Sequence, residues 1–207
     1  KWQRIRYSPA TTLGEDGRRV TACDKHIALS REAACEGMVL LKNDENLLPF
    51  AKGTKLALFG KGTVDYVKGG GGSGDVTVSY TRCLLKGLCI KQNEGKVELF
   101  APLNDYYTAY MQEQYAQGQE PGRCPEAAVP AELLEQARAF TDTAVITLCR
   151  FSGEGWDRTG KPYDGDFYLS REEEAMVHAV EEAFPRIVVV LNTGGMMDTV
   201  WFKDNSK

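Results

Sequence analysis

One glutamate in this sequence lies in a setting suited to proton transfer. Glu154 stands between Gly153 and Gly155 and is followed by Trp156. The glycines leave the carboxylate unshielded and mobile, and the indole offers an apolar surface that would raise a carboxyl pKa. A general acid that works near neutral pH needs a pKa raised in this way. The alternative interpretation is a solvated carboxylate, which is what most loop glutamates are.

The charged residues after the indole favour supporting roles. Asp157 and Arg158 are adjacent, and we expect them to form an ion pair that holds the loop. Asp164 and Asp166 come later in the same stretch, where aspartates commonly serve as turn residues. Within this loop, Glu154 alone is therefore assigned a chemical role.

A second loop of interest is the glycine-rich run from Gly69 to Gly74, which contains Ser73. It follows an apolar run and precedes a predicted helix, which is where a phosphate cradle would lie. The match to phosphate-binding motifs is poor, because Asp75 follows the last glycine and would repel phosphate. Two other interpretations stay open. The glycines satisfy a backbone with positive φ or a close approach, or the loop presents Ser73 to a ligand.

Both loops follow strands of a predicted parallel sheet. Apolar runs predict strands at residues 55–60, 97–100, 144–149 and 187–192. Helices are predicted between and around them, over about residues 25–43, 78–92, 105–117, 131–140, 171–183 and 196–202. Without a hairpin dipeptide between strands, the pattern predicts an α/β sandwich, a flavodoxin-like, three-layer fold with a mostly parallel sheet flanked by helices. Ligands bind beyond the carboxyl ends of such strands.

Helix boundaries and loops can be assigned at several positions. Asp24 is expected to cap the first helix, and Ser170 with Glu173 forms a capping-box pattern before the fifth. Residues 118–130 contain three prolines and are expected to form a surface loop.

The expected domain organisation is simple. Residues 1–24 are polar and predict an extended N-terminal arm, and residues 25–207 predict the α/β domain. The sequence stops after a helix, where the pattern asks for another strand. We therefore expect the final strand or strands of the sheet to be missing.

Composition excludes several classes of protein. The 207 residues are enough to bury one core, and the formal charge of −4 argues against a nucleic-acid partner. No apolar run approaches the length of a membrane span. No apolar leader is visible, which predicts a cytoplasmic protein. Six cysteines without a CxxC pair, and only two histidines, predict reduced structural thiols with no metal and no cofactor.

Taken together, several stretches resemble a known family. They are residues 31–43 (REAACEGMVLLKN), 47–50 (LLPF), 69–75 (GGGGSGD), 152–158 (SGEGWDR), 165–169 (GDFYL) and 188–192 (VVVLN). In this order they resemble the C-terminal-type α/β sandwich domain of glycoside hydrolase family 3, over about residues 27–202. The resemblance implies a retaining, exo-acting β-glycosidase of carbohydrate metabolism, most closely a β-glucosidase.

The resemblance also implies roles for individual residues. Glu154 matches the mobile general acid/base of the family, and Ser73 matches a serine that touches the sugar. Trp156 is expected to contribute to substrate binding. Supporting roles in the two loops fall to Gly72, Gly74, Gly153, Gly155, Asp157 and Arg158.

One catalytic group of the family has no match in this chain. The family's nucleophile is an aspartate of a Ser-Asp-Trp stretch in a (β/α)8 barrel, and no such stretch occurs here. A retaining glycosidase needs both carboxyl groups. We therefore expect a barrel domain of the same polypeptide as partner, a β-linked oligosaccharide or an aryl or alkyl β-glucoside as substrate, and no turnover by the 207 residues alone. The chain is expected to be an excised fragment or the front of a permuted enzyme with the barrel downstream.

Two hypotheses from other classes remain. The domain is a non-catalytic carbohydrate-binding or domain-docking module in which Glu154 is merely solvated, or it binds a nucleotide or phosphate through residues 69–74.

Overall fold

A computed structural model of the chain describes residues 13–18, 20, 22–69, 71–75, 78, 80–120 and 122–203. Two compact units are present, Lys1–Asn46 and Leu47–Lys207, and each is described by itself. The division predicted from the sequence, an arm over residues 1–24 and a domain over 25–207, stays a prediction, and residues 1–12 of that arm lie outside the described part.

The first unit contains one α-helix, α1 (Asp24–Glu36), among its described residues. The helix is shorter than the predicted 25–43 because it stops at Gly37, a residue of low helix propensity. The N-cap position belongs to Cys23, so the expectation that Asp24 caps the helix was wrong; Asp24 is its first residue. A short 3-10 turn, η1 (Asp44–Asn46), ends the unit.

The second unit is built on a parallel sheet, as the sequence predicted. Its strands are β1 (Thr54–Phe59), β2 (Val97–Leu99), β3 (Thr143–Cys149) and β4 (Arg186–Asn192), in the order β2-β1-β3-β4. All neighbouring pairs are parallel. Phe59 pairs with Ile146, and Cys149 pairs with Asn192, so the carboxyl ends of β1, β3 and β4 share one edge of the sheet.

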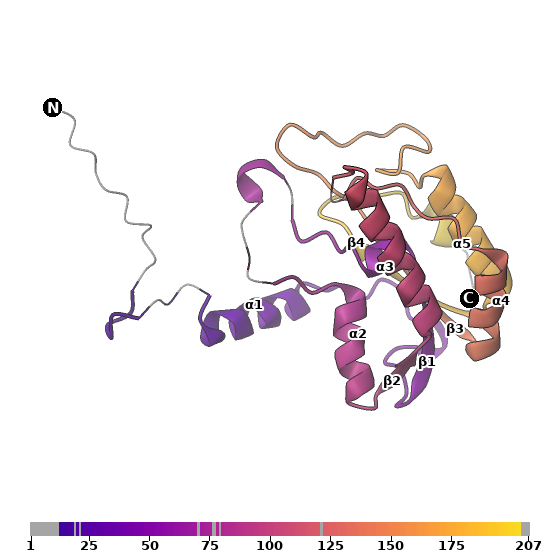
Figure 1. Cartoon of the computed structure of the whole chain (residues 1–207), viewed down its shortest axis with the longest axis horizontal. Helices are drawn as coiled ribbons and strands as arrows, with labels where there is room; N and C mark the ends of the chain where they lie inside the picture. The colour runs from indigo at the N-terminus through magenta and orange to yellow at the C-terminus, as the bar shows by residue number, and fades with distance from the viewer. Residues whose placement is uncertain are drawn as a thin grey trace. The chain divides into compact units, whose positions relative to one another are not determined.

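Helices alternate with these strands (Figure 1). They are α2 (Leu84–Asn93), α3 (Ala101–Ala116), α4 (Ala131–Phe140), α5 (Arg171–Ala183) and α6 (Val200–Lys203), with 3-10 turns η2 (Lys61–Thr63) and η3 (Gly72–Gly74).

Two helices start away from their predicted positions. α2 begins later than residue 78, after a stretch that contains the β-branched Val78 and Thr81, which are poor helix formers. α3 begins earlier than residue 105 because Pro102 fits the first helical turn. The capping box of Ser170 and Glu173 at α5 is confirmed.

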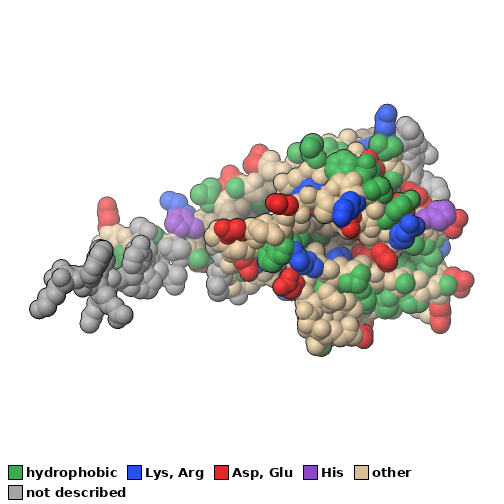
Figure 2. Space-filling view, turned by 90° about the horizontal axis from the view of Figure 1, so that it is seen from above, with side chains coloured by type: hydrophobic (Ala, Val, Ile, Leu, Met, Phe, Trp, Pro, Cys, Tyr) green, Lys and Arg blue, Asp and Glu red, His purple; other side chains and the backbone are tan. Residues whose placement is uncertain are grey.

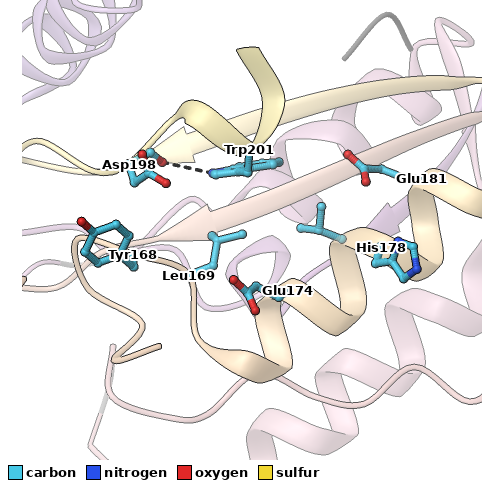
Figure 3. Close-up of a pocket in the computed structure, with 8 residues that line it drawn as sticks. Tyr168, Leu169, Glu174, His178, Glu181, Asp198 and Trp201 are labelled. Atoms are coloured by element: carbon cyan, nitrogen blue, oxygen red, sulfur yellow. Dashed lines mark hydrogen bonds between the residues drawn. The ribbon is translucent and has the colours of Figure 1, made fainter. Parts of the chain in front are cut away.

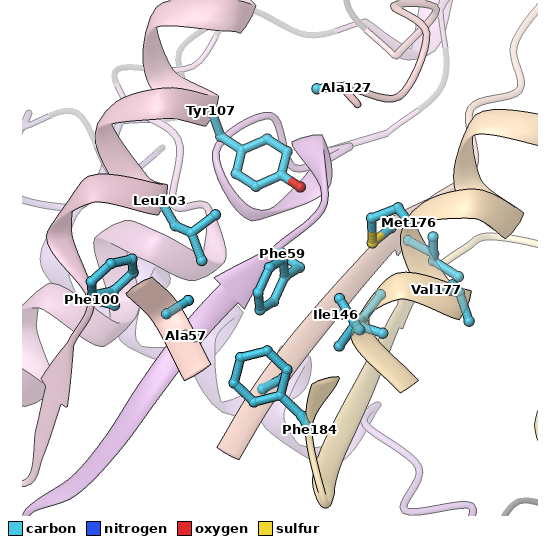
Figure 4. Close-up of a cluster of buried hydrophobic side chains, with 14 of the residues drawn as sticks. Ala57, Phe59, Phe100, Leu103, Tyr107, Ala127, Ile146, Met176, Val177 and Phe184 are labelled. Carbon is cyan, nitrogen blue, oxygen red and sulfur yellow. The ribbon is translucent and has the colours of Figure 1, made fainter. Parts of the chain in front are cut away.

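Two apolar clusters make the unit a three-layer sandwich. Along β1 the side chains alternate, and Ala57 and Phe59 face α3, α4 and α5 on one side of the sheet. Leu56 and Leu58 face α2 on the other side. Figure 4 shows Phe59 at the centre of the larger cluster, where its ring meets that of Phe184 at a centroid distance of 5.4 Å. A strand apolar on both faces is what a covered parallel sheet requires.

The segment between α3 and α4 is only partly a surface loop, contrary to expectation. We call residues 122–130 the strap; its Cys124, Glu126 and Ala127 are buried. The carboxylate of Glu126 accepts the Lys61 N–H at 3.0 and 3.1 Å and the Ala127 N–H at 2.9 Å. It thereby satisfies a backbone donor at the turn that follows β1, and this bond draws the strap onto the sheet.

Tyrosines of α3 hold the rest of the strap. The hydroxyl of Tyr110 donates to the carbonyl of Pro125 at 3.1 Å, and that of Tyr106 donates to the carbonyl of Ala128. The Lys61 ammonium, itself buried, donates to the carbonyl of Cys124. The strap is therefore bonded to η2, the turn that follows β1, and to α3.

On the face that Figure 2 presents, basic and acidic side chains are interspersed with apolar ones.

Glu126 should make stability depend on pH. Burial raises the pKa of this carboxyl to about 7. The N–H bonds from Ala127 and Lys61 and the charge of Lys61 lower the pKa in part, and the charge of Glu173 raises it. The native state therefore holds a proton that the unfolded chain has released above about pH 4.5, and the free energy of unfolding falls as pH rises to about 7.

We expect Glu126→Gln to remove this dependence. Between about pH 4.5 and 8, the unfolding free energy of the wild type should fall relative to the variant by roughly 3 kcal/mol in urea denaturation. The exposed Glu135 on α4 gives the control, Glu135→Gln. Parallel pH profiles of wild type and Glu126→Gln would contradict the assignment.

Candidate functional site

The two predicted loops leave the same edge of the sheet. After β1, the backbone turns at Gly60 with a φ of 92°, and a Cβ there would lie 2.5 Å from the carbonyl oxygen of Thr147 in β3. Glycine is required by both the close approach and the positive φ. Further along, the Val67 N–H donates to the side-chain oxygen of Asn192 at the end of β4, at 2.9 Å. The start of the glycine-rich loop is thus fixed to β1, β3 and β4.

Glu154 lies at the tip of a tight turn. The Trp156 N–H donates to the carbonyl of Gly153 at 2.9 Å, and the pair forms an isolated antiparallel bridge. Gly155, the third residue of the turn, has a φ of 80°, which β-turns of type II require at this position. Glu154 and Gly155 are thus the two central residues of the turn, and both are exposed.

The glycine-rich loop and the Glu154 turn meet. The Ser73 N–H donates to Oε2 of Glu154 at 2.9 Å. A Cβ on Gly72, whose φ is 67°, would lie 2.5 Å from the Cβ and the Oε2 of Glu154. These contacts bring together the residues to which sequence assigned the main roles.

The indole packs against the same glycines. A Cβ on Gly71 would lie 1.8 Å from Cζ3 of Trp156, and one on Gly153 would lie 2.3 Å from the backbone nitrogen of Gly71. Only glycine fits these positions without displacing the neighbour. Close approach to the Glu154 turn therefore explains Gly71 and Gly72, in line with the first of the interpretations that the sequence allowed, whereas a Cβ on Gly69 would meet nothing within 4 Å.

The electrostatic setting of Glu154 differs from the expected one. The side chain is exposed, and hydrogen bonds from the backbone and then the hydroxyl of Ser73 lower the pKa of its carboxyl. The prediction that Trp156 raises this pKa was wrong for this conformation, because the indole packs on Gly71 and Phe151 rather than over the carboxylate. Glu154 is held here as a carboxylate.

Trp156 is surrounded on several sides and is only partly exposed. The guanidinium of Arg123 lies over the ring, 4.5 Å from its centroid, and the ring of Phe151 lies 5.3 Å away at 56°. A Cβ on Gly122 would lie 2.9 Å from the Phe151 side chain. The strap therefore contacts the Glu154 turn through an arginine that the sequence analysis missed.

Arg158 pairs with Asp166, so the predicted ion pair between Asp157 and Arg158 was wrong. Nη2 of Arg158 also donates to the carbonyl of Asp166 at 3.1 Å. The Thr159 N–H donates to the carboxylate of Asp166. The side chain of Asp157 is exposed. Asp166 is thus more than a turn residue, because it ties the outgoing limb of the loop to the returning one.

A buried ion pair fixes the base of the loop. Arg150, directly after β3, donates from Nη1 and Nη2 to the two carboxylate oxygens of Glu173 at 2.7 and 2.9 Å. Its Nε donates to the carbonyl of Asp166 at 2.6 Å. Glu173 also accepts the Ser170 N–H at 2.9 Å. The capping box revealed Glu173, but no sequence signal links it to Arg150.

Other ligand chemistries find less support. The Ser73 N–H that a phosphate cradle would offer binds Glu154, and Asp75 places a carboxylate beside the loop, paired with Lys68 at 2.7 Å. Within the described ranges, no group of three or more histidine, cysteine, aspartate or glutamate side chains is placed to hold a metal ion. No helix in the described part of the chain is both long and apolar enough to cross a bilayer.

A hollow of about 180 Å³ lies between α5 and the segment that leads into α6 (Figure 3). Tyr168 and Trp201 line it together with acidic side chains of α5, and the indole N–H of Trp201 donates to the carbonyl of Asp198 at 3.1 Å. None of the residues predicted for the site lines this hollow.

Comparison with known proteins supports the resemblance seen in the sequence. The domain described as "Glycosyl hydrolase family 3 C-terminal domain" matches residues 38–207. "Beta-glucosidase A" of Butyrivibrio fibrisolvens is 50% identical over the whole chain, which spans 27% of that protein. "Beta-glucosidase" of Ruminococcus albus is 29% identical over 84% of the chain, which spans 18% of it. The chain thus spans about a quarter or less of these relatives.

Solved structures give the same result. β-Glucosidase 3B from Thermotoga neapolitana, in complex with glucose, superposes on 91% of the chain with a TM-score of 0.79 and 31% identity; the match covers 26% of that structure. A β-glucosidase from Paenibacillus barengoltzii superposes on 88% with a TM-score of 0.78 and 28% identity, over 20% of its length.

We expect Gly71→Ala to displace the indole of Trp156. The added methyl would overlap the ring, and such overpacking costs about 1–3 kcal/mol. Acrylamide should therefore quench the fluorescence of Trp156 more strongly, with the Trp156 signal taken as the difference from Trp156→Phe. Gly69→Ala is the matched control, because its Cβ meets nothing within 4 Å. Equal effects of the two alanines would contradict the contact.

We expect Ser73→Ala to raise the pKa of Glu154. The variant removes the hydroxyl bond that lowers this pKa and keeps the backbone bond. The midpoint of the ¹³Cδ shift of Glu154 in an NMR pH titration should therefore move upward. Ser152→Ala, in the same loop as Glu154, serves as control. An unchanged or lowered midpoint in Ser73→Ala would show that the hydroxyl does not bind the carboxylate.

Proposed function

The chain belongs to glycosyl hydrolase family 3, and we propose on this basis that it is the acid/base-bearing domain of a retaining, exo-acting β-glycosidase. The substrates are terminal, non-reducing β-linked sugars, of β-glucosides in the first place, since the most similar relatives reported above carry the name β-glucosidase. The nucleophile comes from a (β/α)8 barrel domain of the same polypeptide, and the active site forms where the two domains meet.

One observation carries the proposal. The Ser73 N–H and the carboxylate of Glu154, far apart in the sequence, meet at the carboxyl edge of the sheet, where α/β folds bind ligands. The exposed carboxylate sits on a glycine-flanked turn above a base that Arg150 and Glu173 hold. Such a turn can carry a proton donor toward a sugar bound against a second domain.

The reaction proceeds in two steps. Glu154 gives its proton to the glycosidic oxygen while the nucleophile of the barrel attacks the anomeric carbon and the aglycone leaves. Glu154, now a carboxylate, then takes a proton from the water that hydrolyses the glycosyl-enzyme, and the anomeric configuration is retained. Ser73 contacts the sugar, and Trp156 lines its binding site.

We infer that the position beside Ser73 is a resting position of Glu154. The Ser73 bonds favour the carboxylate, whereas the first step needs the acid. The side chain must therefore leave Ser73 when substrate and barrel bury it, and desolvation then raises its pKa. When the Ser73 hydroxyl binds the sugar it no longer donates to Glu154, so substrate binding removes one of the two Ser73 bonds that lower this pKa. The cytoplasmic location and the role in carbohydrate metabolism remain predictions from the sequence.

We expect Glu154→Gln, in the full-length protein, to act according to the leaving group. Gln cannot donate the proton, so kcat/KM for cellobiose should fall by about a hundredfold or more. For 2,4-dinitrophenyl β-glucoside, whose leaving group needs no proton, the fall should stay below about tenfold. Glu135→Gln is the control. Equal losses on the two substrates would remove Glu154 from the acid/base role.

A further inference from the structure

Arg123 is a charged side chain of the strap that the proposed mechanism does not use. Its guanidinium lies over the ring of Trp156, 4.5 Å from the centroid, and its Nε lies 3.7 Å from the carboxylate of Glu120. The side chain is 42% exposed, so its charge is not buried. Arginine stacks its planar guanidinium on an aromatic face, which makes this contact directional.

The strap gives Arg123 a fixed support. On one side of Arg123, the Gly122 N–H lies 3.5 Å from the carboxylate of Asp65, and Phe151 packs against Gly122. On the other side, Cys124 is buried and accepts the Lys61 ammonium at its carbonyl, and Glu126 binds the Lys61 N–H. The backbone on both sides of the arginine is therefore attached to the segment that follows β1.

The Glu154 turn needs such a support. Glycines flank Glu154, and glycine restricts the backbone least. Within the turn, Trp156 is the large side chain, and its N–H closes the turn on Gly153. A side chain that holds the indole therefore limits where the carboxylate can go. Misplacing a catalytic group by about 1 Å can cost a large factor in rate.

We propose that Arg123 is a positioning residue for the Glu154 turn: the strap holds its guanidinium on Trp156, and the indole fixes the turn that carries the acid/base. This role rests on the function proposed above for Glu154. Arg123 does not act by shifting the pKa of Glu154, because the bonds from Ser73 account for the lowering of that pKa.

The test compares Arg123→Ala with Arg138→Ala in the full-length protein. Arg138 is a matched control: like Arg123 it pairs with a nearby carboxylate, that of Asp142, and it is 44% exposed, against 42% for Arg123. We expect Arg123→Ala to lower kcat/KM for cellobiose about fivefold, the scale of one exposed cation–π contact. The change for 2,4-dinitrophenyl β-glucoside should stay within about twofold. Arg123→Lys should fall between wild type and alanine on cellobiose.

A second readout reports the contact directly. Acrylamide quenching of Trp156, taken as the difference from Trp156→Phe, should increase in Arg123→Ala and stay unchanged in Arg138→Ala. Equal losses on both substrates, no loss on either, or unchanged quenching would each overturn the positioning role.

Glu154→Gln, measured in parallel, separates the two proposals. If Glu154→Gln shows the leaving-group dependence and Arg123→Ala does not, then only the role proposed for Arg123 is wrong. If Glu154→Gln itself lacks the dependence, the acid/base assignment fails, and the role of Arg123 fails with it.

Discussion

The ion pair between Arg150 and Glu173 is the interaction on which the candidate site depends. The two side chains are 2% and 5% exposed, and breaking such a pair leaves a buried charge without its partner. The carboxylate is matched by two guanidinium N–H groups and the Ser170 N–H, while the guanidinium also binds the carbonyls of Cys149 and Asp166. One pair thus fixes the end of β3, the return of the loop and the start of α5.

Above this base, the two loops pack against each other through glycines rather than through an ion pair. Gly71, Gly72 and Gly153 allow two loops to approach until Ser73 and Glu154 bond, and none of the three has room for a Cβ. The base of the loop is buried and fully bonded, whereas the carboxylate at its tip is exposed. This division suits a group that must leave one partner and find another. Arg123 and the strap limit that freedom from the side, through Trp156.

The sequence predicted the features that depend on local patterns. Apolar runs such as Lys55–Gly60 specified strands buried on both faces, and Ser170 with Glu173 specified a helix start. The sequence also placed the loops of Glu154 and Ser73 after two strands of the sheet, but it did not predict that the two residues bond to each other. The contacts that the sequence did not predict correctly depend on partners that are not neighbours in the chain. Glu126 binds Lys61 from far along the chain, Arg158 prefers Asp166 to its neighbour, and Trp156 turns toward glycines rather than over Glu154. No local sequence pattern specifies these contacts, because the packing of the folded chain determines them.

The most direct test of the account is azide rescue of Glu154→Ala in the full-length protein. With an activated aryl β-glucoside, the variant should accumulate glycosyl-enzyme, because no group activates water for the second step. Azide needs no general base, so its addition should restore turnover and give a β-glycosyl azide, identified by the anomeric coupling in the ¹H NMR spectrum. Turnover that azide leaves unchanged, or an azide product of α configuration, would contradict Glu154 as the acid/base of a retaining enzyme.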